Sequence, residues 1–167
     1  MYEDRKLDEA KYFLARMQLA QASREERTFT FEASAFLSAA RSVLLYACDE
    51  AKGNGKQAWY DAWVSRDESL RFLRDERDEN IHRRPVAPVT IESVAPGPLV
   101  GNDQYQTVET EFAFLEWRGP ENAVALSQRI LDALERMVQD GQQVGCLSRY
   151  DATYEPGRRS RRTSGCS

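Results

Sequence analysis

The sequence is poor in the residues that build common metal and disulfide sites. It contains one histidine and three cysteines among 167 residues. Cys48, Cys146 and Cys166 lie far apart, so they match neither a metal-ligand spacing nor a disulfide framework. The chain also lacks a glycine-rich phosphate loop and internal repeats. We therefore expect no metal site and no bound cofactor.

Long apolar runs and a net positive charge are missing as well. The most apolar stretch, residues 29–48, contains Glu32, Arg41 and three serines, which makes it too polar for a membrane span. The first six residues are mostly charged and do not resemble a signal peptide. A formal charge of -4 disfavours general polyanion binding. We expect a cytoplasmic protein with no membrane contact.

The composition otherwise fits one globular domain, with 41% hydrophobic and 30% charged residues. Patterned sequence covers residues 1–140, which we assign to a single domain. Glycine, serine and arginine dominate residues 141–167, where four arginines follow Glu155. We predict a flexible, arginine-rich tail there.

Apolar residues spaced by three and four predict helices over residues 4–22, 28–52, 57–64, 67–83 and 121–139. Thr28 or Thr30 is the expected cap of the second helix, and Ser65 or Asp67 that of the fourth. The second helix is apolar on most sides, so we place it centrally. Pro120 is expected in the first turn of the last helix, and Gly141 at its end.

The pattern changes between residues 88 and 117. Residues 88–94 are rich in β-formers, and residues 104–117 alternate between apolar and polar positions. Proline and glycine at 95–98 predict a turn between them. We therefore predict a mainly α bundle of four to five helices with a small β-hairpin insertion.

The only histidine belongs to a run rich in groups that act on phosphates: Arg77-Asp78-Glu79-Asn80-Ile81-His82. Histidine transfers protons near neutral pH, and arginine clamps phosphates. On a helical wheel Arg77 shares the apolar face of Leu70 and Leu73, whereas Asp78 is the helical neighbour of His82. Positions 77 and 82 diverge by about 140°. Both could reach one phosphate only at a frayed helix end, or across an interface with a second copy.

A polar seam crosses the predicted central helix at Ser34, Ser38, Arg41 and Ser42. These small hydroxyl groups would either let another helix approach closely or line a polar cleft together with Arg41. Purely structural readings of the run 77–82 also exist. With Arg83 and Arg84 beside it, His82 fits an ordinary positively charged helix end, and Arg77 fits a buried ion pair with a carboxylate such as Glu32.

The spacing of Arg77 and His82, with polar Asp78 after the arginine, resembles the motif of the HEPN superfamily. The resemblance implies a helical bundle that forms homodimers and cleaves RNA without a metal, in many members as a toxin or in defence against phage. It implies catalytic roles for Arg77, His82 and Asp78. We add Asn80, Arg41 and Arg83 as substrate-binding candidates. An antitoxin is a possible partner. The alternatives are a non-catalytic module of this fold that binds a protein or nucleotide, and a structural interaction protein.

Overall fold

The computed structural model describes residues 2–82, 88–100 and 103–148. Over residues 76–82, 93–100 and 103–109 only the backbone is described. The element order along the chain is α1 (Tyr2–Ala22), α2 (Glu26–Gly53), α3 (Gln57–Arg66), α4 (Glu68–His82), β1 (Pro88–Val100), β2 (Asp103–Phe114) and α5 (Ala123–Gln143). The predicted mainly α fold with a small β-hairpin is confirmed.

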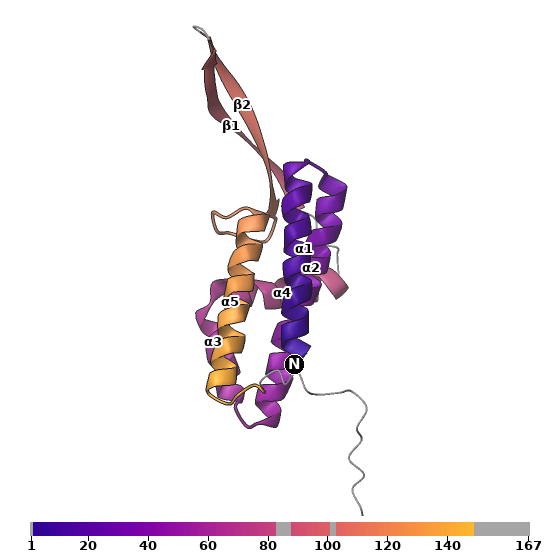
Figure 1. Ribbon diagram of the computed structural model, residues 1–167, viewed down its shortest axis with the longest axis vertical. Coiled ribbons are helices and arrows are strands. Elements are labelled where there is room, and N and C mark those ends of the chain that lie inside the picture. The colour runs from indigo at the N-terminus through magenta and orange to yellow at the C-terminus, as the bar shows by residue number, and fades with distance from the viewer. Residues whose placement is uncertain (1, 83–87, 101–102, 149–167) are drawn as a thin grey trace, which may run out of the picture.

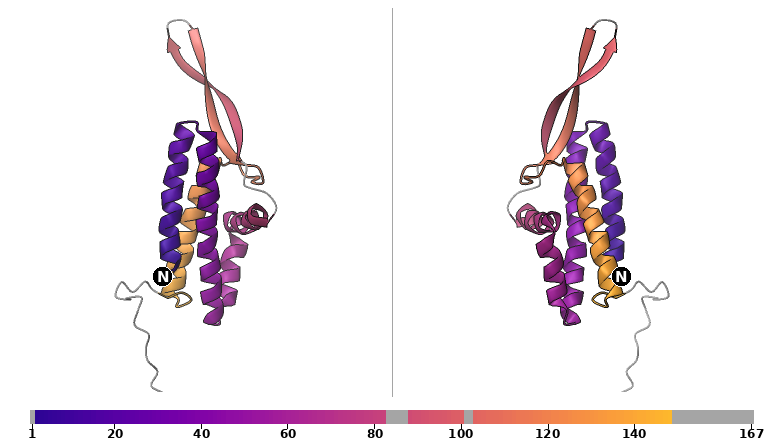
Figure 2. Two further views of the ribbon diagram at one scale, coloured as in Figure 1. Left: turned by 90° about the vertical axis from the view of Figure 1, so that its right-hand side faces the viewer. Right: turned by 90° about the vertical axis from the view of Figure 1, so that its left-hand side faces the viewer.

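Three long helices, α1, α2 and α5, run side by side along the molecule (Figure 1). The shorter α3 lies beside the lower part of these three helices in Figure 1. In Figure 2, α4 is seen nearly end-on while the long helices stand upright, so α4 lies across the bundle. Within the described residues no helix is long and apolar enough to cross a membrane.

Helix α2 is the centre of the core, as predicted, because it packs against all four other helices. Its side chains at Phe29, Phe36 and Leu44 are fully buried. A helix needs an apolar surface on most sides to occupy such a place. The prediction of Thr28 or Thr30 as its cap is wrong, since α2 begins at Glu26. The Thr30 hydroxyl instead donates to the Glu26 carbonyl inside the helix.

Asp67 caps α4, one of the two predicted options. Its Oδ1 accepts from the backbone N–H of Ser69 at 2.9 Å and of Leu70 at 3.3 Å. These donors have no partner within the helix, and a carboxylate there also suits the positive end of the helix dipole. The cap sets where α4 starts, and Leu70 and Leu73 then fall on its buried face.

The hairpin projects from one end of the bundle (Figures 1 and 2). Its antiparallel ladder runs from Pro88 opposite Phe114 to Val100 opposite Asp103. The turn predicted at residues 95–98 is therefore wrong. These residues belong to β1, and the register is irregular between Pro96 and Leu99. Proline cannot donate to a ladder, so here it produces an irregularity rather than a reversal.

Two phenylalanines of β2 anchor the hairpin to the helices. Phe112 stacks on Phe29 of α2, with ring centroids 4.3 Å apart, and Phe114 packs near Phe72 of α4 at 5.9 Å. Both belong to the predicted apolar face of the strand and are buried. The opposite face is wetter, with Val89 and Ile91 exposed near the base.

Both predicted ends of α5 differ from the structure. Helix α5 begins at Ala123, so Pro120 lies before its first turn rather than within it. Asn122 caps the helix, and its side chain accepts from the N–H of Ala125 at 2.9 Å. Gly141 does not end α5, which continues to Gln143. A Cβ at Gly141 would lie 2.6 Å from Leu147 and 2.7 Å from Trp59. The glycine is there because other segments press against the helix backbone.

Candidate functional site

The predicted motif lies at the C-terminal end of α4. Helix α4 extends to His82, so Arg77, Asp78, Asn80 and His82 all lie on it. Their backbone is described and their side chains are not. Arg83 lies outside the described residues. Because the helix continues through His82, positions 77 and 82 stay about 140° apart around its axis.

Glu32, proposed as an alternative partner of Arg77, pairs with another arginine. The Glu32 Oε1 accepts from Arg16 Nε at 3.1 Å. This pair joins α1 to α2, and it raises the pKa of Arg16 through the hydrogen bond to Glu32 and the negative charge of that carboxylate. Glu32 therefore has a structural role that does not involve Arg77.

Part of the polar seam of α2 forms a hydrogen bond within the helix itself. The Ser42 hydroxyl donates to the Ser38 carbonyl at 2.8 Å. Arg41 is different, because its Nε is enclosed and finds no hydrogen-bond acceptor among the described residues. A buried donor without an acceptor costs about 1–3 kcal/mol. Arg41 is therefore the one seam residue whose placement its described surroundings do not satisfy.

The charges of Arg41 on α2 and Arg74 on α4 both act on Tyr60 of α3. Tyr60 is buried, and burial is the main reason why its pKa is raised, followed by the charge of Cys48. The positive charges of Arg41 and Arg74 act in the opposite sense. Arg41 also lowers the pKa of Tyr60 through a side-chain hydrogen bond. Sequence reasoning found Arg41 but missed its interaction with Tyr60, because the two residues lie on different helices.

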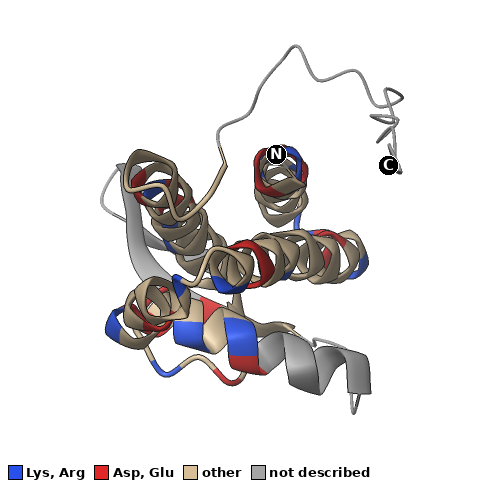
Figure 3. Ribbon diagram, turned by 90° about the horizontal axis from the view of Figure 1, so that it is seen from below, with Lys and Arg blue, Asp and Glu red and all other residues tan. Residues whose placement is uncertain are grey.

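The rest of the described part of α4 carries a mixed charge pattern. Figure 3 shows basic and acidic positions following one another along it. Arg74 contacts Asp75 at 2.8 Å, and both side chains are well exposed. This agrees with the solvated face expected for a run of alternating charge.

A second polar cluster joins α3 to the end of α5. Trp59 and Trp63 both donate their indole N–H to Asp140 Oδ2, at 2.7 and 2.8 Å. These bonds are the main reason why the pKa of Asp140 is lowered. The Arg66 guanidinium stacks on the Trp63 ring, 3.4 Å from its centroid. The two tryptophans therefore have a structural role at the contact between α3 and α5.

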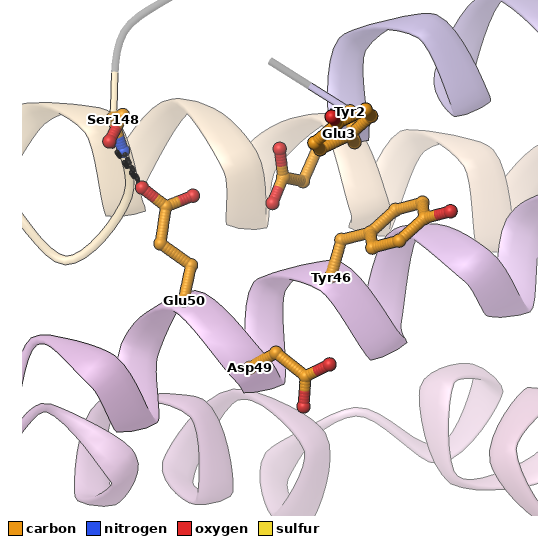
Figure 4. Close-up of a pocket in the computed structure, with 6 residues that line it drawn as sticks. All are labelled: Tyr2, Glu3, Tyr46, Asp49, Glu50 and Ser148. Carbon is orange, nitrogen blue, oxygen red and sulfur yellow. Dashed lines mark hydrogen bonds between the residues drawn. The ribbon is translucent and has the colours of Figure 1, made fainter. Parts of the chain in front are cut away.

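A cavity of about 280 Å³ lies where the first turn of α1 meets the last turns of α2. Figure 4 shows its lining, which consists of Tyr2, Glu3, Tyr46, Asp49, Glu50 and Ser148. Glu50 Oε1 accepts from both the backbone N–H and the hydroxyl of Ser148. The rings of Tyr2 and Tyr46 lie 5.4 Å apart. Across the described residues, no three histidine, cysteine or acidic side chains are placed to hold a metal ion.

Comparison of the chain with protein-family models, with curated proteins and with solved structures gives no match. The candidate site therefore rests on the chain's own residues. The structure places the motif on the last turns of α4, which packs against α2 and α3.

Proposed function

We propose that this protein is a metal-independent endoribonuclease of the HEPN type that works as a homodimer. In this proposal His82 moves protons, and Arg77 binds the phosphate and stabilises its developing negative charge. Asp78, four residues before His82 on the helix, orients the imidazole. Arg41, Asn80 and Arg83 contact the RNA strand.

The reaction uses a nucleophile that RNA itself carries. A base removes the proton of the 2′-hydroxyl, and that oxygen attacks the adjacent phosphorus. The P–O bond to the 5′-oxygen of the next nucleotide breaks, and an acid protonates this oxygen. The products are a 2′,3′-cyclic phosphate and a free 5′-hydroxyl. Two histidines, one from each chain, suffice for the base and acid roles.

The observation that carries the proposal is the course of α4. This helix continues to His82 and crosses the bundle in contact with the central helix. A five-helix fold with the Arg–His spacing at the end of a later helix is what the resemblance implies.

The same helix geometry makes a second copy necessary. Arg77 and His82 of one chain diverge on an intact helix, so in this proposal the phosphate lies between the two chains and is reached by groups from both. The outer side of α2 offers a surface for pairing, because Phe31 and Leu45 are exposed there, with Ser38 midway between them. Exposed apolar groups interspersed with small residues favour helix packing in a homodimer.

The test is incubation of the full chain with total RNA in EDTA. The wild type should cleave RNA and leave 2′,3′-cyclic ends, whereas His82→Ala should lose activity by about 10²-fold or more, as expected for a general acid or base. Arg77→Ala should be similarly impaired. Light scattering on the same samples should give the mass of a dimer. Full activity in His82→Ala would contradict the proposal.

A second candidate function is a non-catalytic helical module of this fold that binds a protein partner. The hairpin favours it, since a two-stranded ribbon projects from the bundle with Val89 and Ile91 exposed. Isolated ribbons are only marginally stable, and a partner strand or helix would cover this one. Absence of cleavage together with partner binding that depends on Ile91 would favour this function.

A further inference from the structure

We propose that α2 pairs with the same helix of a second copy of the chain, antiparallel and about a two-fold axis at Ser38. In this arrangement Phe31 packs on the partner's Leu45, and Arg27 faces the partner's Asp49. The choice of a second copy as the occupant rests on the proposed function, which requires a homodimer. The register of the contact follows from the residues of α2 alone.

Between residues 27 and 49, the exposed side chains of α2 form one row along the helix. They belong to Arg27, Phe31, Ser38, Leu45 and Asp49, which we call the outer row. These positions lie within about 40° of one another around the helix axis. The side chains of Phe31 and Leu45 are 62% and 43% exposed. Large apolar groups aligned on one exposed surface are typical of an interaction site.

The outer row is symmetric about Ser38. Towards either end of the helix, the next members lie seven and eleven residues away from it. In a two-fold contact, residue i of one copy meets residue j of the other, and j meets i. An antiparallel pair of α2 helices centred on Ser38 therefore places apolar members against apolar ones, and each charged member against its opposite.

The middle of the outer row allows two helices to approach closely. Ser38 is flanked by the half-buried Ser34 and Ser42, so the side chains around the axis are small. The Ser42 hydroxyl donates to the Ser38 carbonyl of its own helix at 2.8 Å, and it keeps this acceptor when the surface is covered. Small residues at a contact bring helix axes to about 8 Å, the close end of the usual range.

The charged ends of the outer row select the register. Arg27 lies over the Phe31 ring, 5.6 Å from its centroid, and so belongs to the same surface. An exposed ion pair contributes little to affinity, whereas like charges placed opposite each other suppress a wrong alignment. A two-fold contact contains the pair of Arg27 and the partner's Asp49 twice, which doubles its effect.

The experiment measures the dimer dissociation constant, Kd, of the full chain by sedimentation equilibrium at about 0.1 M salt. Arg27→Asp and Asp49→Arg should each raise Kd about tenfold or more, because either change places like charges opposite each other twice in the dimer. An equimolar mixture of the two variants should restore the wild-type Kd. In the mixed dimer, opposite charges face each other again across the interface.

Two further variants test the apolar and central parts of the row. Leu45→Glu should be monomeric at concentrations at which the wild type is a dimer, because it places a charge against the partner's Phe31. The matched control is Leu19→Glu at a 62% exposed leucine of α1, which should leave Kd unchanged. In a Cys166→Ser background, Ser38→Cys should form a disulfide-linked dimer on oxidation, because only residues at the axis come close enough to their own copies. Circular dichroism checks that each variant is folded.

The outcomes separate this inference from the proposed function. A monomeric wild type, or a Kd that Leu45→Glu and Leu19→Glu leave equally unchanged, would overturn the interface. If the mixed charge variants restore the dimer but the wild type cleaves no RNA, the interface stands and the proposed function fails. If the wild type cleaves RNA as a dimer that Leu45→Glu leaves intact, the proposed function stands and the pairing through α2 is wrong.

Discussion

The cluster of Trp59, Trp63 and Asp140 provides the sharpest test of how this fold is held together. One carboxylate oxygen accepts two indole N–H groups, at 2.7 and 2.8 Å, from a helix about 80 residues away in sequence. Asp140→Ala removes the acceptor of both bonds at once. The two indoles then lie at the α3–α5 contact without a partner.

The expected loss follows from the number and kind of bonds. A hydrogen bond to a charged group contributes about 1.5–3 kcal/mol. The combined contribution of the two hydrogen bonds is smaller than twice this value, because Trp59 is only half-buried and water can replace part of its bond. We expect Asp140→Ala to lower the free energy of unfolding by about 2–4 kcal/mol. For a domain of this size, that corresponds to a fall in melting temperature of roughly 5–15 °C.

The assay is urea unfolding at pH 7 followed by circular dichroism, because the substitution itself alters tryptophan fluorescence. The matched control is Asp132→Ala on the same helix, which removes the same charge and one exposed hydrogen bond to Gln128. The control should change stability by no more than about 0.5 kcal/mol. Equal midpoints for Asp140→Ala and Asp132→Ala would refute the reasoning.

The same cluster predicts a pH dependence. The pKa of Asp140 is lowered in the folded protein by its bonds to Trp59 and Trp63, so the unfolded chain takes up a proton first as the pH falls. The stabilisation is therefore complete above the unfolded pKa of about 3.9 and is lost as the pH falls through the lower, folded value. The stability difference between wild type and Asp140→Ala should be constant from pH 7 to about pH 5 and shrink below pH 4. A difference that grew on acidification would contradict this sign.

Three further substitutions test packing and capping by urea unfolding. Gly141→Ala should cost about 1–3 kcal/mol through overpacking, whereas Gly53→Ala, which meets nothing within 4 Å, should have little effect. Phe112→Ala should cost about 3–5 kcal/mol, because it leaves a cavity under the hairpin, and the exposed Leu115→Ala is its control. Asp67→Ala should cost about 1 kcal/mol through loss of the α4 cap, and Asp67→Ser should retain most of it. A Gly141→Ala variant as stable as Gly53→Ala would contradict the close approach seen at α5.

Hydrophobic spacing predicted the five helices and two strands of the described part of the chain, because burial of one side leaves a period in the sequence. It also identified α2 as central and Phe112 and Phe114 as the buried face of their strand. The ends of elements were less predictable. Two prolines and one glycine at residues 95–98 predicted a turn, yet the ladder continues past them to Val100.

The candidate site divides in the same way. Arg77, Asp78 and His82 are neighbours in sequence, so their place at the end of one helix was predictable. Arg41 and Tyr60 interact from two different helices, and no spacing in the sequence links them. The angular separation of Arg77 and His82 also became firm only when α4 was found to continue through His82.

The sequence by itself determined the helical class, the central helix and the hairpin, since these follow from the local periodicity of apolar residues. Only the tertiary structure decided which distant polar groups meet. Asp140 accepts hydrogen bonds from two indoles, and Leu147 packs closely against Gly141. Both contacts form because α3, α5 and the segment after α5 converge at one end of the bundle. Contacts between distant residues depend on the angles at which helices cross. Side-chain packing between elements sets these angles, and it produces no periodic pattern in the sequence.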